Sequence, residues 1–120
     1  MSEPRHEALE AVLERFSGRR VAILGDCMLD RYVWGRVDRI SPEAPVPVVE
    51  IERESFTLGG ACNVAANLRA LGAEPVLFGV VGDDADAAAL RTALDRAGIS
   101  SKRVITDPTR PTTVKTRIVA

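Results

Sequence analysis

The chain has 120 residues, of which 46% are hydrophobic and 28% charged, and its formal net charge is −1. This length suits one small domain with a single core. The dispersed basic residues are balanced by acidic ones, which argues against a nucleic-acid or membrane-surface partner. No apolar run reaches transmembrane length and the polar N-terminus lacks a signal-peptide core, so we expect a cytoplasmic protein.

The first half of the chain predicts a helix, a strand and a flap. Residues 7–17 carry apolar side chains at helical spacing and precede a glycine, which predicts an amphipathic helix. Residues 20–26 contain a continuous apolar run, typical of a strand that is covered on both faces. Residues 32–52 suggest two or three short strands broken by a turn, and three prolines there favour an edge or flap over a central strand.

The second half alternates helices with strands. The glycine pair Gly59 and Gly60 precedes a helix of small residues that begins at Ala61 or Cys62 and ends at Gly72, where a left-handed cap is expected. The remaining predicted elements are a buried strand at 75–81, a helix at about 85–97 with an acidic cap, a short strand at 102–106 and a strand at 112–119. This order predicts an α/β fold with a parallel sheet, in which the flap is an insertion.

The glycine pair and Asn63 form the first candidate site. Neither glycine has a Cβ, so the backbone can approach a bound molecule closely. A helix that starts directly afterwards directs free N–H groups to the same place, and the Asn63 amide can both donate and accept. The combination suits a polyhydroxylated ligand better than a bare anion. A tight turn before a closely packed helix explains the same spacing equally well.

Two carboxylates follow the first buried strand and form a second candidate. Ligands of open α/β sheets bind outside the carboxyl ends of the strands, where Asp26 and Asp30 could accept hydrogen bonds from hydroxyl groups. The alternative is structural, with Asp26 capping a turn and Asp30 pairing with an arginine.

The strand at 112–119 carries a third candidate. Thr113, Lys115 and Arg117 alternate along it and therefore share one face. Two cations two residues apart could hold a phosphate, and the arginine offers a bidentate fork. From the residues alone, an ordinary solvated strand face is the favoured explanation.

Other chemical motifs are absent from the sequence. There is no Walker A loop, and Gly25 is not followed by the spaced glycines of a dinucleotide fingerprint. His6 stands alone and no metal-ligand spacing occurs, so we expect no metal site. With no export signal, Cys27 and Cys62 are expected to be reduced and structural.

The glycine-rich stretch resembles the N-terminal signature of the ribokinase-like, or PfkB-type, carbohydrate kinases. Every fixed position of that signature is filled, by Gly59, Gly60, Ala61, Asn63, Ala65, Gly72 and Gly82. The resemblance implies a Rossmann-like parallel sheet of the ribokinase fold with a small β-lid. It also implies that Gly59, Gly60 and Asn63 bind sugar, and that Asp30 matches the acidic residue that binds sugar hydroxyls at the end of the first strand.

The flap residues resemble one particular group of kinases within this family. Residues 29–35, 39–49 and 111–117 are similar to the D-glycero-β-D-manno-heptose 7-phosphate kinases, which occur alone or as the N-terminal half of a bifunctional ADP-heptose synthase. The resemblance implies ATP- and Mg²⁺-dependent phosphorylation of the sugar at C1, in the route to ADP-heptose and the lipopolysaccharide core. Lys115 and Arg117 would then hold the 7-phosphate, and the lid at about 32–52 would cover the sugar and join a homodimer.

The extent of the chain differs from that of this family. The family's catalytic Asp and its nucleotide site lie near the C-terminus of a longer chain. The resemblance therefore implies that residues 1–120 are the N-terminal, sugar-binding portion of a kinase domain, with no catalytic residue of their own, and that they are inactive alone. The alternatives are a kinase for another sugar or a nucleoside, and a non-catalytic sugar-binding or dimerisation fragment.

Overall fold

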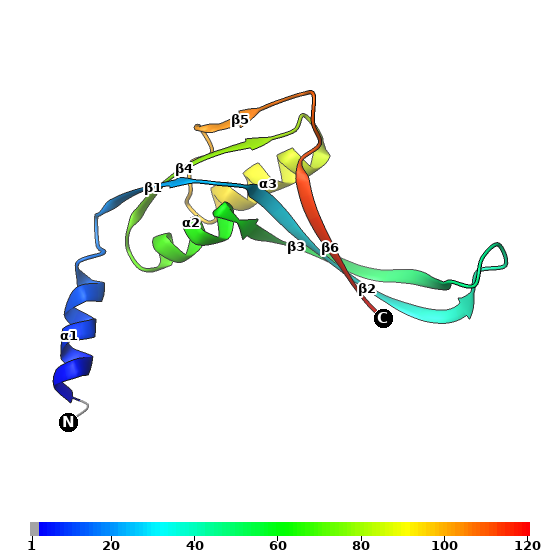
Figure 1. Ribbon diagram of the computed structural model, residues 1–120, viewed down its shortest axis with the longest axis horizontal. Coiled ribbons are helices and arrows are strands. Elements are labelled where there is room, and N and C mark those ends of the chain that lie inside the picture. Colours follow the sequence, from blue (N-terminus) through cyan, green and yellow to red (C-terminus); the bar gives the residue numbers. More distant parts are fainter. Residues whose placement is uncertain (1–2) are drawn as a thin grey trace.

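The computed structural model describes residues 3–120, which form three helices and two three-stranded sheets (Figure 1). In chain order the elements are α1 (Glu3–Glu14), β1 (Arg20–Leu24), β2 (Cys27–Ile40), β3 (Pro47–Gly60), α2 (Ala61–Ala70), β4 (Glu74–Val81), α3 (Ala85–Arg96), β5 (Val104–Thr106) and β6 (Thr113–Val119). The α/β class with parallel strands is thus confirmed. None of the helices is long and apolar enough to span a membrane, as far as residues 3–120 are described.

The first sheet has the parallel order β1-β4-β5, and α2 and α3 cover one of its faces (Figure 1). The side chains that fill the space between this sheet and the helices are Leu77, Val81, Ala87, Leu90, Leu94 and Val104. The opposite face is bare among the described residues, with Leu24 87% and Ile105 62% exposed. The prediction that β1 is covered on both faces is therefore wrong for residues 3–120, because they supply only one helical layer.

The second sheet has the order β3-β2-β6 and contains a long hairpin that extends away from the rest of the molecule (Figure 1). We call residues 27–60 the lid hairpin. Two strands separated at residues 41–46 are present as predicted, but each has 14 residues, so the prediction that they are short is wrong. The three prolines do not interrupt a strand, because Pro42 and Pro45 lie in the connecting loop and Pro47 is the first residue of β3.

The helices follow their local signals closely. The glycines after α2 and α3, Gly72 and Gly98, have φ values of 90° and 74°, and Asp84 caps α3 as predicted. Helix α1 begins and ends a few residues earlier than its apolar spacing predicts, and none of its side chains is buried.

The two cysteines lie where the hairpin meets α2. Both thiols are free and buried, as predicted, and the Cys62 thiol is hydrogen-bonded to that of Cys27. This hydrogen bond and burial raise the pKa of Cys62 well above its ordinary value. The same hydrogen bond lowers the pKa of Cys27, and both side chains belong to the core where β2 meets α2.

Candidate functional site

The glycine pair lies at the junction of β3 and α2. Gly60 has a φ of 56° and precedes the first turn of α2, and a Cβ there would overlap the carbonyl oxygen of Asp26. A Cβ on Gly59 would lie 3.0 Å from the Asp30 carboxylate. The Asp26 carbonyl also accepts a hydrogen bond of 2.8 Å from Ala61 N–H. The tight turn that the sequence allows is therefore present, and it brings bare backbone against Asp30.

Asp30 is the best-placed acceptor for a ligand. It lies within β2 and not at the end of the first strand, where the family resemblance would put it. Its side chain is half-buried, and the Oδ1 atom is buried with no hydrogen-bond partner among the described residues. A buried carboxylate oxygen without a partner is unfavourable, and a ligand hydroxyl would satisfy it.

The register of the second sheet brings the predicted cations to Asp30. Asp30 pairs with Lys115 of β6 and with Thr57 of β3. Two residues further along the strands, Tyr32 pairs with Arg117 on the same face. This second pair lies about 7 Å from the pair of Asp30 and Lys115, because a strand rises about 3.3 Å per residue. Residues paired in this way project from the same face of a sheet. We call this face the ligand face. It carries Lys115 and Arg117 together, as their alternation in the sequence predicts, and it adds Asp30, which the sequence did not place with them.

Aromatic rings continue the ligand face outward along the lid hairpin. The rings of Tyr32 and Trp34 stack with centroids 5.8 Å apart. The guanidinium of Arg117 lies 5.8 Å from the Tyr32 ring, and that of Arg53 lies 4.0 Å from the Trp34 ring. Arg53 was not among the predicted site residues, because only the pairing of β3 with β2 brings it here.

Asn63 lies in the first turn of α2 and is exposed. It sits at the same end of the helix as the glycine pair, as its sequence position predicts. The N-cap residue of α2, Gly60, provides no side-chain acceptor for the N–H groups of this turn. A ligand at this end of α2 would therefore meet backbone donors and the Asn63 amide together.

A hydrogen-bonded cluster at the start of α3 fixes the segment before β6. Asp84 accepts hydrogen bonds from the Thr112 hydroxyl at 2.6 Å, the Thr112 N–H at 2.9 Å and the Ala87 N–H at 2.8 Å. The bonds from Thr112 and Ala87 hold the pKa of Asp84 below its ordinary value. The sequence predicts the acidic cap but not its bond to Thr112, which is 28 residues away.

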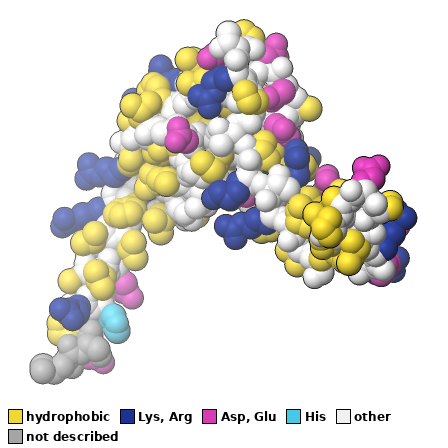
Figure 2. All heavy atoms as spheres, turned by 45° about the vertical axis from the view of Figure 1, so that its right-hand side comes forward, with side chains coloured by type: hydrophobic (Ala, Val, Ile, Leu, Met, Phe, Trp, Pro, Cys, Tyr) yellow, Lys and Arg dark blue, Asp and Glu magenta, His cyan; other side chains and the backbone are white. Residues whose placement is uncertain are grey.

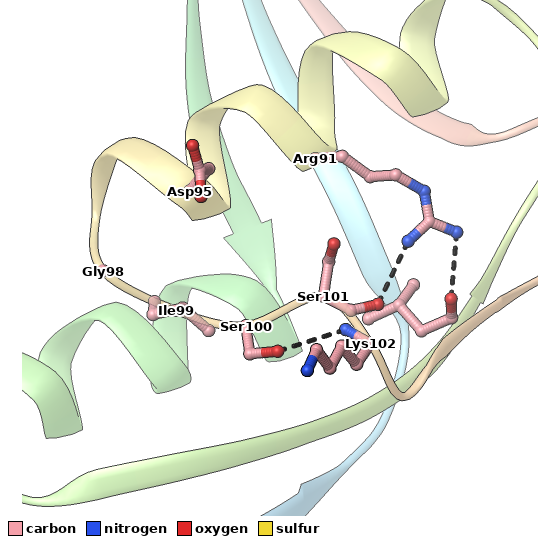
Figure 3. Close-up of a pocket in the computed structure, with 8 residues that line it drawn as sticks. Arg91, Asp95, Gly98, Ile99, Ser100, Ser101 and Lys102 are labelled. Atoms are coloured by element: carbon pink, nitrogen blue, oxygen red, sulfur yellow. Dashed lines mark hydrogen bonds between the residues drawn. The ribbon is translucent and has the colours of Figure 1, made fainter.

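Two concave regions border the sheets. A crevice of about 210 Å³ opens at the carboxyl ends of β1 and β4, and its polar walls include Asp26 and Arg110. An open pocket of about 750 Å³ lies at the C-terminal end of α3 (Figure 3). Its Arg91 is engaged by the carbonyl groups of Ser101 and Val104, at 3.1 and 2.9 Å, and therefore holds the connecting loop.

Residues 3–120 contain no group of three or more His, Cys, Asp or Glu side chains placed to hold a metal ion. The chemistry of the ligand face consists of a carboxylate, three cations (Lys115, Arg117 and Arg53) and two aromatic rings. These groups suit a molecule that carries both hydroxyl groups and a negative charge.

Residues 19–120 match the model of the pfkB family of carbohydrate kinases. The chain therefore belongs to the pfkB carbohydrate kinase family. It is 52% identical over 115 residues to the bifunctional protein HldE of Caulobacter vibrioides, covering 95% of this chain and 24% of that protein. The HldE protein of Helicobacter pylori strain 26695 is 50% identical over 102 residues, covering 85% and 22%. The chain thus spans about a quarter of the length of the curated relatives it matches.

Solved structures show the same fold. The structure of Arabidopsis thaliana ribokinase complexed with ribose and ATP matches with a TM-score of 0.65 at 21% identity, over 85% of this chain and 32% of that one. Xylella fastidiosa fructokinase with bound ATP matches with a TM-score of 0.62 at 19% identity, over 84% and 30%. The ribokinase-type fold and the family resemblance are therefore confirmed.

Proposed function

We propose that residues 1–120 form the sugar-binding portion of an ATP-dependent kinase. The kinase phosphorylates D-glycero-β-D-manno-heptose 7-phosphate at C1, giving the 1,7-bisphosphate in the route to ADP-heptose and the lipopolysaccharide core. Membership of the pfkB family and about 50% identity to HldE proteins support this activity. The observation that carries the substrate class is the buried, unpartnered carboxylate oxygen of Asp30 in the same row as Lys115.

In this proposal the negative and positive groups of the ligand face bind different parts of the substrate. Asp30 accepts hydrogen bonds from sugar hydroxyls, while the glycine turn and Asn63 contact the sugar from the end of α2. A carboxylate repels a phosphate, so the phosphate lies toward Lys115 and Arg117, where cations attract it. A sugar phosphate therefore lies along β2 and β6, with its hydroxyl groups over Asp30.

The chemical step requires groups outside this ligand face. In this proposal ATP supplies the phosphoryl group and Mg²⁺ neutralises its charge. The base that takes the hydroxyl proton and the nucleotide site belong to a part of the kinase beyond residue 120. The residues of this chain bind the sugar, orient it and cover it with the lid hairpin.

We also propose that a second copy of the chain covers the outer face of the lid hairpin. This face lies opposite the ligand face and carries exposed apolar side chains of β2, β3 and β6, namely Val37, Ile40, Ile51, Phe56 and Ile118. Figure 2 shows hydrophobic side chains gathered over the hairpin where it comes forward. Two such faces are complementary to one another, so a symmetric homodimer buries both.

The test uses a hybrid protein in which residues 1–120 replace the matching segment of Caulobacter vibrioides HldE. Isothermal titration compares heptose 7-phosphate with the unphosphorylated heptose. We expect Lys115→Ala and Arg117→Ala to weaken binding of heptose 7-phosphate far more than binding of the unphosphorylated heptose. Thr116→Ala, on the opposite face of β6, is the control and leaves both affinities unchanged. If the two variants lose affinity for both sugars equally, or for neither, then Lys115 and Arg117 do not bind the phosphate.

A further inference from the structure

Strand β6 has little of its own to hold it in place. None of its side chains is buried, and those from Lys115 to Val119 are exposed. It pairs with one strand only, β2, and the pairing is parallel. Because only Val114 of β6 packs against the core, and is itself only partly buried, the position of β6 depends largely on the backbone ladder and on the residue that anchors its start.

That anchor is Thr112, which is 5% exposed and directly precedes β6. Its hydroxyl donates to Asp84 at 2.6 Å and accepts from the Gly82 N–H at 2.9 Å, while its own N–H donates to Asp84 at 2.9 Å. The turn that holds it is tight, because a Cβ on Gly82 would lie 2.8 Å from the Thr112 nitrogen. Thr112 thus uses three hydrogen bonds to fix one end of the strand.

The same turn of α3 also holds the partner strand. Asp86 pairs with Arg31 of β2 at 2.6 Å, and Arg31 follows Asp30 in the sequence. Asp84 and Asp86 therefore attach β6 and β2 to one rigid helix start. The offset between Asp30 and the cations of β6 is therefore held by the backbone ladder between the two strands together with this turn.

We propose that Asp84 and Thr112 are positioning residues that place Lys115 and Arg117 for the phosphate of the sugar substrate. This inference rests on the proposed function. Lys115 is three residues beyond Thr112, so a movement of Thr112 is carried along β6 to both cations. Neither Asp84 nor Thr112 needs to contact the sugar. Their loss weakens recognition of the phosphate while recognition of the hydroxyls, through Asp30, is kept.

The experiment measures the affinity of the hybrid protein for heptose 7-phosphate and for the unphosphorylated heptose. Thr112→Val keeps the branched shape and removes the hydroxyl, and we expect the preference for the phosphorylated sugar to fall on the order of tenfold. Thr112→Ser keeps the hydroxyl and is expected to retain the preference. Thr92→Val on α3 is the matched control, because its hydroxyl bonds only to the Ala88 carbonyl of its own helix.

Amide hydrogen exchange of β6 gives a readout without ligand. We expect faster exchange at residues 113–119 in Thr112→Val but not in Thr112→Ser. If Thr112→Val keeps the preference for the phosphorylated sugar, this inference alone is overturned. It is also overturned if Thr112→Val weakens binding of both sugars equally, because that result indicates a merely structural role. A wild-type hybrid with no preference for the phosphorylated sugar overturns the proposed function, and this inference falls with it.

Discussion

Gly60 combines two requirements for glycine, since its backbone is left-handed and its missing Cβ leaves room for the Asp26 carbonyl. Gly60→Ala in the hybrid protein is expected to lower the free energy of unfolding by more than about 2 kcal/mol, through strain and overlap together. Gly18→Ala is the matched control. Gly18 has a φ of 72° but no atom within 4 Å of an added Cβ, so only the backbone strain remains.

Urea unfolding of the two variants separates these effects. If Gly60→Ala lowers the free energy of unfolding clearly more than Gly18→Ala does, then close packing against Asp26 requires the glycine. Equal losses would mean that the left-handed conformation alone explains why glycine is needed there.

Asn63 tests the sugar contacts of α2. Asn63→Ala removes a donor and an acceptor while keeping a good helix former, so we expect sugar affinity to fall by about 1–3 kcal/mol. ATP affinity should stay unchanged, because in the proposed function the nucleotide binds elsewhere. Asn67→Ala is the control, since Asn67 is also exposed but lies one turn further along α2. Titration calorimetry in which both variants behave alike would remove Asn63 from the site.

At the level of elements, the bond between α3 and β6 predicts a dependence on pH. The folded-state pKa of Asp84 is depressed, chiefly by the Thr112 hydrogen bonds. Its stabilisation is therefore fully present above the ordinary Asp pKa of about 3.9 and is lost as the pH falls through the lower folded value. We expect Asp84→Asn to be less stable than wild type at pH 7, with the difference shrinking in acid.

Chemical denaturation at pH 7 and in the acidic range checks this expectation. Asp83→Asn removes the same charge from the preceding residue, which makes none of these hydrogen bonds, and serves as the control. Hydrogen bonds from Thr109 also depress the pKa of Asp107, so acid sensitivity should decrease in Asp84→Asn without disappearing. A stability difference that is constant with pH would show that the Asp84 charge has no role in holding β6.

The outer face of the lid hairpin predicts the oligomeric state. Ile51→Asp places a charge on the apolar face that a second copy would cover, and we expect the hybrid protein to change from dimer to monomer. Ala44→Asp, in the exposed loop of the hairpin, adds the same charge outside this face and should leave the dimer intact. Sedimentation equilibrium distinguishes the outcomes, and a dimer that survives Ile51→Asp must use another surface.

The elements that could be predicted from the sequence have local signals. Helix α3 has its cap at Asp84 and its stop at Gly98, and β4 has a largely apolar sequence from Pro75 to Val81. The lid hairpin was predicted as shorter strands because prolines usually interrupt pairing. Here they occupy the loop and the first position of β3, where no ladder N–H is needed, and only the folded hairpin reveals this.

The candidate site was predicted residue by residue, but its assembly was not. Asp30 and Lys115 were identified separately, and their pairing joins positions 85 residues apart. Such pairings depend on which strands become neighbours, and no local pattern encodes that choice. The bond from Thr112 to Asp84 and the placement of Arg53 over Trp34 were missed for the same reason.

The molecule as a whole is unusually extended for its length. Its radius of gyration is 19.2 Å, whereas a compact domain of this length would have about 14 Å. The lid hairpin and α1 both project from the body (Figure 1), and α1 exposes the apolar side chains Leu9, Val12 and Leu13. A parallel sheet is normally covered on both faces, so the bare face of β1-β4-β5 is the largest departure from a finished core.

This bare surface leads to a prediction for residues 1–120 expressed alone. Leu24 and Ile105 on the bare sheet face and Leu9 on α1 have no covering layer within the described chain, and exposed apolar faces of this kind associate. We expect the segment to form aggregates or mixed oligomers and to show no kinase activity above a blank without protein. The hybrid protein, with the remainder of the relative, should be monodisperse. Light scattering and amide NMR spectra compare the two. A monomeric segment that melts cooperatively and gives well-dispersed amide signals would show that the lid hairpin and the single helical layer suffice for folding.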